Sequence, residues 1–133
     1  MKYEFLEHTA DIKFRAFGNS LNEAFENSVL AFSSFVSRGE KIVSRRRKTI
    51  EIEGEDKENL FYNFLEALIG LLDDGFAVSR GRIEIRGKKL KAVLFGDDVD
   101  NYSGLDHVKA ATYSEMFVGR NGKVWEVQAV LDV

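Results

Sequence analysis

The amino-acid sequence predicts an α+β fold in which two helices pack on one face of a mainly antiparallel β-sheet. Two stretches carry apolar residues at the three- and four-residue spacing of a helix, and each lies beside stretches whose apolar residues alternate. The last part of the chain reads as strands joined in pairs by short turns. Helices separated by strands and followed by hairpins are typical of a sheet with helices on one side.

The first part of the chain predicts a strand followed by a helix. Residues 11–17 alternate between apolar and polar side chains, which indicates a half-buried strand, and a shorter strand is expected at residues 3–7. The segment Ser20-Leu21-Asn22-Glu23 has the form of a capping box, in which serine and glutamate side chains accept hydrogen bonds from free amides at a helix start. The apolar helix stripe behind it is Leu21, Ala24, Phe25, Ser28, Phe32 and Phe35.

The middle of the chain predicts a third strand and a second helix. Residues 38–48 are basic and have no helical period, and residues 49–53 then alternate around two isoleucines. Asp56 is suited to cap the second helix and Gly75 to end it. The apolar stripe of this helix is Phe61, Phe64, Leu65, Leu68 and Leu72.

The remaining sequence predicts two hairpins. The first turns at Gly87-Lys88-Lys89, and the second turns around Asn121-Gly122, which is a strong hairpin signal. The four strands are expected at residues 76–86, 89–95, 108–118 and 123–132.

Length and composition indicate one globular domain over residues 1–133. The chain has 44% apolar and 31% charged residues, which is ordinary for a folded domain. Its formal net charge of -3 disfavours a wholly basic nucleic-acid binder but leaves a local basic patch open. No apolar stretch is long enough for a bilayer and the first residues do not form a secretory signal, so we expect a cytoplasmic protein with no membrane contact.

The sequence contains none of the common catalytic motifs. Cysteine is absent and only two histidines are present, which excludes thiolate chemistry and a multi-histidine metal site within one chain. Neither glycine-rich nucleotide loop nor a G-x-S-x-G segment occurs. The patterns therefore predict no catalytic residue and no nucleotide cofactor site.

Two charged segments each have a functional and a structural interpretation. The acidic segment Gly96–Asn101 fails the spacing of an EF-hand, because Tyr102, Ser103 and Lys109 occupy the key ligand positions, so a solvated acidic turn is favoured. The basic run Arg38–Lys48 could contact RNA phosphates or an acidic protein, or could be a solvated loop. The lack of flanking aromatic residues for base stacking favours the loop.

Two aspartates could form a metal site if their strands are neighbours. The apolar alternation of the last strand continues to the final residue, so Asp132 is expected at an ordered strand end. Asp11 begins the polar face of the strand at residues 11–17. Two adjacent carboxylates repel each other, and a divalent cation with oxygen ligands would relieve that repulsion. The alternatives are an exposed Asp132 and an Asp11 that accepts amide hydrogen bonds at a turn.

The sequence resembles the archease family over essentially its whole length. The resemblance rests on several blocks in order, of which the first and the last are the most specific. These blocks are His8-Thr9-Ala10-Asp11-Ile12, Gly18 to Phe25, Gly54-Glu55-Asp56, Val108 to Tyr113 and Leu131-Asp132-Val133.

The resemblance implies a bound divalent cation, which is calcium in the family, although oxygen ligands also suit magnesium and manganese. The implied ligands are Asp11, Asp132 and Val133, the last through its main-chain oxygens. Lys109 matches a polar family position, and Ser114 stands where the family often has histidine.

The resemblance also implies a function. By its resemblance to archease, the protein is expected to be a protein cofactor that activates an RtcB-type RNA ligase in tRNA splicing. It would promote guanylylation of the ligase and its multiple turnover. The family is also linked to chaperone-like modulation of a tRNA cytosine methyltransferase. Contact with RNA is then expected to be indirect or weak. A direct RNA-binding module using Arg38–Lys48 and a metal-dependent hydrolase with His8 as base remain as alternatives.

Overall fold

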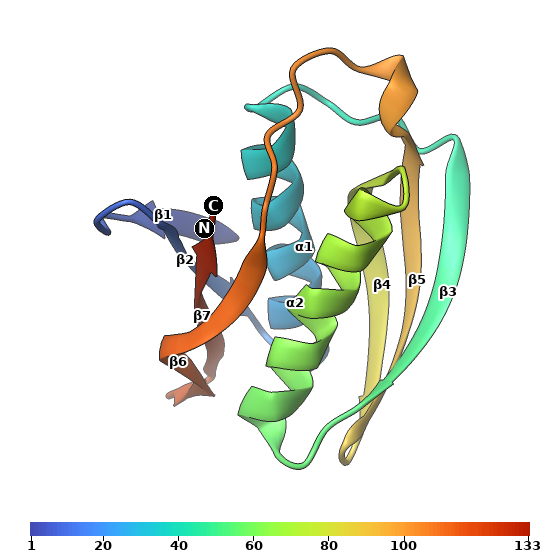
Figure 1. Ribbon diagram of the computed structural model, residues 1–133. Helices are drawn as coiled ribbons and strands as arrows, with labels where there is room; N and C mark the ends of the chain where they lie inside the picture. Colours follow the sequence, from blue (N-terminus) through green and yellow to red (C-terminus); the bar gives the residue numbers. More distant parts are fainter.

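The computed structural model describes residues 1–133 and has three layers, with two helices packed between two antiparallel sheets (Figure 1). The helices are α1 (Leu21–Ser37) and α2 (Lys57–Asp73). The four-stranded sheet has the order β1 (Tyr3–Leu6), β2 (Ile12–Gly18), β7 (Val124–Asp132) and β6 (Ala110–Asn121). The three-stranded sheet has the order β3 (Arg46–Glu53), β5 (Lys89–Asp98) and β4 (Phe76–Arg86), and a short 3-10 turn, η1 (Val99–Asn101), follows β5.

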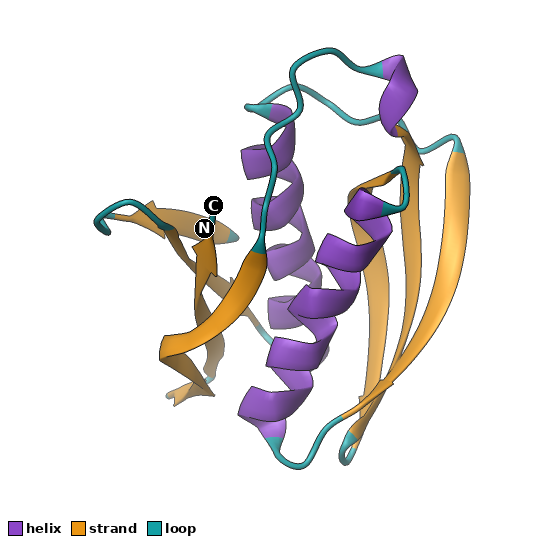
Figure 2. Ribbon diagram, viewed as in Figure 1, coloured by secondary structure: helices purple, strands orange, loops and turns teal.

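The α+β class, the two helices and the antiparallel pairing are confirmed, but the strands divide between two sheets instead of forming one. The reason is visible in the helices, whose buried residues extend beyond a single stripe. In α1 the buried positions include both Phe25 and Val29 as well as Ala24 and Ala31. A helix buried on two sides needs a layer against each side. Figure 2 shows the two helices between the sheets, so the outer face of the three-stranded sheet carries no helix.

Both predicted helix starts are confirmed in detail. The Glu23 amide donates to Ser20 Oγ at 3.1 Å, and the Glu23 carboxylate accepts from the amide of Asn19 at 2.9 Å. The Asn59 amide donates to Asp56 Oδ1 at 2.7 Å. Each cap satisfies an amide that has no partner within its helix, so both helices begin where the sequence predicts.

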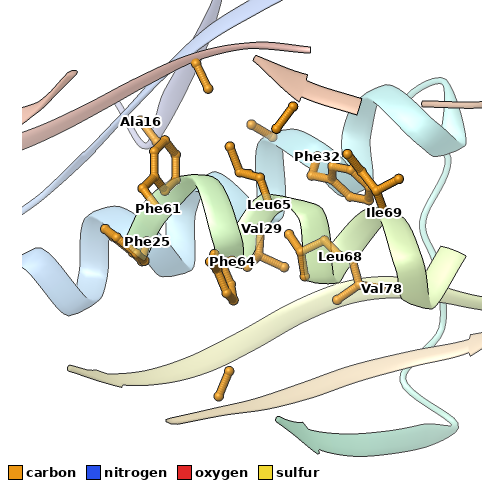
Figure 3. Close-up of a cluster of buried hydrophobic side chains, with 14 of the residues drawn as sticks. Ala16, Phe25, Val29, Phe32, Phe61, Phe64, Leu65, Leu68, Ile69 and Val78 are labelled. Atoms are coloured by element: carbon orange, nitrogen blue, oxygen red, sulfur yellow. The ribbon is translucent and has the colours of Figure 1, made fainter. Parts of the chain in front are cut away.

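The core lies in the helical layer and extends into both sheets. Phe61 of α2 lies 4.9 Å from Phe25 of α1 and 6.4 Å from Phe14 of β2 between ring centroids. Figure 3 shows Phe61 and Phe25 beside Ala16 of β2, with Val78 of β4 below the helices. All of these side chains are buried, so one apolar cluster joins the two sheets.

The hairpin turns are confirmed and some strand bounds differ from the predictions. Gly87 and Gly122 adopt φ values of 61° and 68°, which is the left-handed region that tight turns require. Strand β3 begins at Arg46, inside the basic run, and β6 begins at Ala110 and not at residue 108. Neither helix has the length and apolar character needed to span a membrane.

Candidate metal centre

The strand β7 is central in its sheet, and its end lies between the beginnings of β2 and β6. Ile12 pairs with Leu131, so Asp11 and Asp132 stand at the same end of neighbouring strands. On the other side Asp132 pairs with Ala110, and the Lys109 amide donates to the Asp132 carbonyl oxygen at 2.8 Å. The end of β7 is therefore fixed from both sides. We call Asp11, Asp132 and the main-chain oxygens of Val133 the acidic strand end.

The acidic strand end offers oxygen donors that are accessible to solvent. The Asp11 side chain is 30% exposed, and Asp132 and Val133 are both exposed. Neither aspartate forms an ion pair with a lysine or arginine. Hard carboxylate and carbonyl oxygens suit calcium, magnesium and manganese, so the residue types fit a divalent cation.

The side chains alone do not form a complete metal site. No group of three histidine, cysteine, aspartate or glutamate side chains is arranged to hold a metal ion. A cation bound at the acidic strand end would therefore need main-chain oxygens as further donors, which is the part that the family resemblance assigns to Val133.

His8 lies beside Asp11 and has an unusual environment. Its Nδ1 atom is buried without a hydrogen-bond partner and lies 3.6 Å from Asp11 Oδ2, while its Nε2 atom lies 3.0 Å from Glu115 Oε2. A buried nitrogen without a partner is costly in a folded protein. The imidazole thus lies between Asp11 and a third carboxylate, that of Glu115 on β6, and is hydrogen-bonded only to the latter.

Glu115 is a site residue that the sequence analysis missed. It has a left-handed φ of 54° in a bulge of β6, where the pairing with β7 shifts between Thr112 and Phe117. Gln128 fixes this bulge, since its Nε2 donates to the Glu115 carbonyl oxygen at 2.7 Å. The only sequence signal is an interrupted alternation, because Ser114 and Glu115 are consecutive polar residues within the strand.

The bulge brings Glu115 to a lysine of β2. Lys13 Nζ donates to Glu115 Oε1 at 3.1 Å, and this hydrogen bond and the charge of Lys13 lower the pKa of Glu115, with a smaller contribution from His8. Lys13 therefore forms its ion pair with Glu115. The acidic strand end keeps its negative charge with no lysine paired to it.

The basic run does not form a continuous surface, because most of its arginines are paired. Arg38 Nη2 lies 2.8 Å from Asp106 Oδ1, and Arg45 and Arg46 pair with Asp97 and Asp98. Each carboxylate neutralises one of the charges that an RNA backbone would require.

The acidic segment is structural, and the prediction of a solvated turn is wrong for Asp97, which is 1% exposed. Burial raises the pKa of Asp97, but hydrogen bonds from Tyr102, the Asp98 amide, Arg45 and Asn101 together lower this pKa below its ordinary value. The Tyr102 hydroxyl donates to Asp97 at 2.8 Å and accepts from the Val43 amide at 2.8 Å. Asp97 therefore anchors the basic segment to the end of β5.

The fold and the site define a class of protein, namely a small α+β domain that presents acidic oxygen donors at the end of a central strand. Comparisons with known proteins agree with this fold. The family model described as "Archease protein family (MTH1598/TM1083)" matches residues 3–133. The chain belongs to the archease family.

Relatives of known sequence or structure cover nearly the whole chain. The archease of Pyrococcus abyssi is 37% identical over 99% of both chains, and that of Sulfurisphaera tokodaii is 34% identical over 99% of both. The solution structure of Methanobacterium thermoautotrophicum protein 1598 superposes with a TM-score of 0.81 at 25% identity, covering 98% of each chain. A crystal structure from Thermotoga maritima, titled an archease and possible chaperone, gives a TM-score of 0.67 at 26% identity and covers 96% of this chain and 94% of that one.

Proposed function

We propose that this archease is a non-catalytic, cytoplasmic accessory protein of tRNA splicing that activates an RtcB-type RNA ligase by promoting its guanylylation and multiple turnover. The proposal includes a divalent cation, calcium or alternatively magnesium or manganese, held by Asp11, Asp132 and the main-chain oxygens of Val133. The observation that carries it is the placement of Asp11 and Asp132 at the same end of paired strands.

The residues of the acidic strand end have distinct parts in this proposal. Asp11 directly precedes β2 and Asp132 ends β7, so the fixed register of these two strands brings both carboxylates to the same end of the sheet. The Lys109 amide fixes the end of β7 by donating a hydrogen bond to the Asp132 carbonyl oxygen. When bound, a divalent cation neutralises phosphate charge during nucleotidyl transfer. Asp132 is exposed and Asp11 is partly exposed, which supports presentation of this group to a partner enzyme.

A multiple-turnover ligation assay with the ligase from the same source tests the proposal. We expect the wild-type protein to increase turnover and the variants Asp11→Ala and Asp132→Ala to lose this stimulation, because each removes one carboxylate donor. Asp100→Ala is the matched control, since Asp100 is an exposed aspartate in η1, away from the strand end.

Circular dichroism must first show that each variant keeps the fold. Stimulation that survives both Asp11→Ala and Asp132→Ala would refute the metal-based mechanism. An unstimulated ligase with wild-type protein would refute the activating role itself.

The second candidate function is chaperone-like modulation of a tRNA cytosine methyltransferase. The description of the Thermotoga maritima relative as a possible chaperone favours it. Methylation of tRNA by that enzyme, measured with and without this protein and in the absence of ligase, separates the two functions. A change in methylation together with an unchanged ligation rate would favour the second candidate.

A further inference from the structure

The outer face of the three-stranded sheet carries an uncovered group of arginines around an aromatic ring. Phe95 of the central strand β5 pairs with Arg47 of β3 and with Arg80 of β4. Arg82 pairs with Val93, two residues along the same face. The three arginines are exposed and Phe95 is partly exposed. We call these arginines and Phe95 the arginine patch.

A bulge in β4 creates this arrangement. The pairing with β5 shifts between Val78 and Arg80, so that Ser79 is the extra residue. Val78 before the bulge is buried against the helices, whereas Arg80 after it lies on the outer face. Bulges commonly redirect a side chain in this way. The Arg80 guanidinium carbon then lies 4.1 Å from the Phe95 ring centroid, and that of Arg82 lies at 5.9 Å.

The charges of the arginine patch are not neutralised within the protein. Arg47, Arg80 and Arg82 form no ion pair and donate no side-chain hydrogen bond. The opposite end of the same face differs, because Arg86 pairs with Glu84 at 2.6 Å and Lys89 lies 3.6 Å from Glu53. In a chain with a net charge of -3, three unpaired arginines on one small surface are a local exception.

We propose that the arginine patch binds single-stranded RNA. Surfaces that bind single strands combine cationic side chains for the phosphates with an aromatic or guanidinium plane on which an unpaired base stacks. The Phe95 ring supports the Arg80 guanidinium, so an unpaired base can stack on this guanidinium while Arg47 and Arg82 contact phosphates. A duplex would keep its bases stacked and out of reach of the arginine patch. The choice of RNA over DNA rests on the proposed function.

This surface differs from the basic run expected in the sequence. Only Arg47 belongs to that run, and the other two arginines come from β4. The aromatic residue that the run lacks is supplied by β5. The arginine patch is also on a different sheet from the acidic strand end, so the two surfaces can be occupied at the same time.

Fluorescence anisotropy of a labelled single-stranded RNA of about 12 nucleotides tests the proposal with the protein alone. The double variant Arg80→Gln/Arg82→Gln should bind at least about tenfold more weakly and show a shallower dependence of affinity on salt, because fewer counterions are released. The matched control Arg86→Gln/Lys91→Gln removes the same charge from the other end of the same face, and should change affinity less than about twofold.

A second pair of variants tests the stacking part. Phe95→Leu should weaken RNA binding about fivefold or more. Phe95→Tyr keeps an aromatic face and should bind RNA with the affinity of the wild type. Equal losses in the two arginine double variants, no binding of RNA at low salt, or tighter capture of polyglutamate than of RNA would overturn the proposal. DNA of the same sequence bound as tightly as RNA would overturn the assignment to RNA.

The two proposals fail separately, because this experiment contains no ligase. Intact RNA binding with an unstimulated ligase would contradict only the proposed function. Stimulation of ligation by a protein that does not bind RNA would contradict only the arginine patch.

Discussion

The two sheets pack on the same helices but use their outer charges differently. In the four-stranded sheet the two cations of β2 have partners within the protein: Arg15 donates to Gln128 at 2.7 Å and stacks over Phe117, and Lys13 donates to Glu115. In the three-stranded sheet the arginine patch forms no ion pair. The cations of β2 thus have partners in their own sheet, whereas those of the arginine patch do not.

This difference indicates which kind of ligand each sheet can bind. In the four-stranded sheet, two carboxylates that lack a lysine or arginine partner, Asp11 and Asp132, stand together at the end of β7, and this placement suits a small cation. The three-stranded sheet leaves unpaired cations at one end of its outer face, which suits an extended anionic strand. The same fold therefore supports a candidate cation site at one strand end and a candidate anion-binding surface on one sheet face.

The largest effect is expected from Phe61→Ala, which tests whether the two sheets form one cooperative unit. Phe61 is fully buried in the helical layer, so its truncation should cost about 3–5 kcal/mol of unfolding free energy. Trp125 in β7 is the only tryptophan, so its fluorescence reports on the four-stranded sheet while far-UV circular dichroism reports on both. We expect the two signals to change together during urea unfolding.

The control for this variant is Phe5→Ala, since Phe5 is 46% exposed and should lose about 1 kcal/mol or less. Separate transitions for fluorescence and circular dichroism would mean that the sheets unfold independently.

The next effect concerns acid stability of the three-stranded sheet. Hydrogen bonds outweigh burial and lower the pKa of Asp97 in the folded protein, so its ionised form stabilises the fold above the unfolded pKa of about 3.9. This stability is lost as the pH falls through the lower folded pKa. The variant Asp97→Asn should reduce the Tm at pH 7 and flatten its dependence on pH in this acid range.

Thermal unfolding between pH 7 and acid pH measures this effect. Asp98→Asn is the control, because the Asp98 side chain is 52% exposed and should contribute less. An equal loss of Tm in Asp97→Asn and Asp98→Asn would contradict the anchoring role of Asp97.

The smallest effect is expected from Glu115→Gln in the four-stranded sheet. Lys13 lowers the pKa of Glu115, so the ionised form again stabilises the fold above the ordinary glutamate pKa of about 4.3, and this stability is lost at lower pH. The Glu115 side chain is 49% exposed, so solvent screens the interaction and the Tm change should be smaller than for Asp97→Asn. The same series of thermal scans compares the two variants, and a larger loss for Glu115→Gln would reverse the ranking.

Much of the fold could be predicted because its signals are local. The two helix caps depend on residues three apart, and the hairpin at Asn121-Gly122 depends on one turn. The division into two sheets could not be predicted in this way, since it depends on which sides of α1 are covered. Alternation identifies strands but does not determine their neighbours.

The candidate sites show the same limit. The sequence indicated Asp11 and Asp132 separately, and only the register of β2 with β7 brings them to one end of the sheet. Glu115 was missed because a bulge turns it toward Lys13. The arginine patch was missed because the β4 bulge and the pairing with β5 bring distant residues together.

Calorimetric titration of calcium into the purified protein tests the central claim, that the acidic strand end binds a divalent cation. We expect one binding site per chain in the wild-type protein and in the control Asp98→Asn/Asp100→Asn, which removes the same charge from the acidic segment. Binding should be lost in Asp11→Asn/Asp132→Asn. The claim would be contradicted if the wild-type protein bound none of calcium, magnesium and manganese. It would also be contradicted if Asp11→Asn/Asp132→Asn bound calcium as tightly as the wild type.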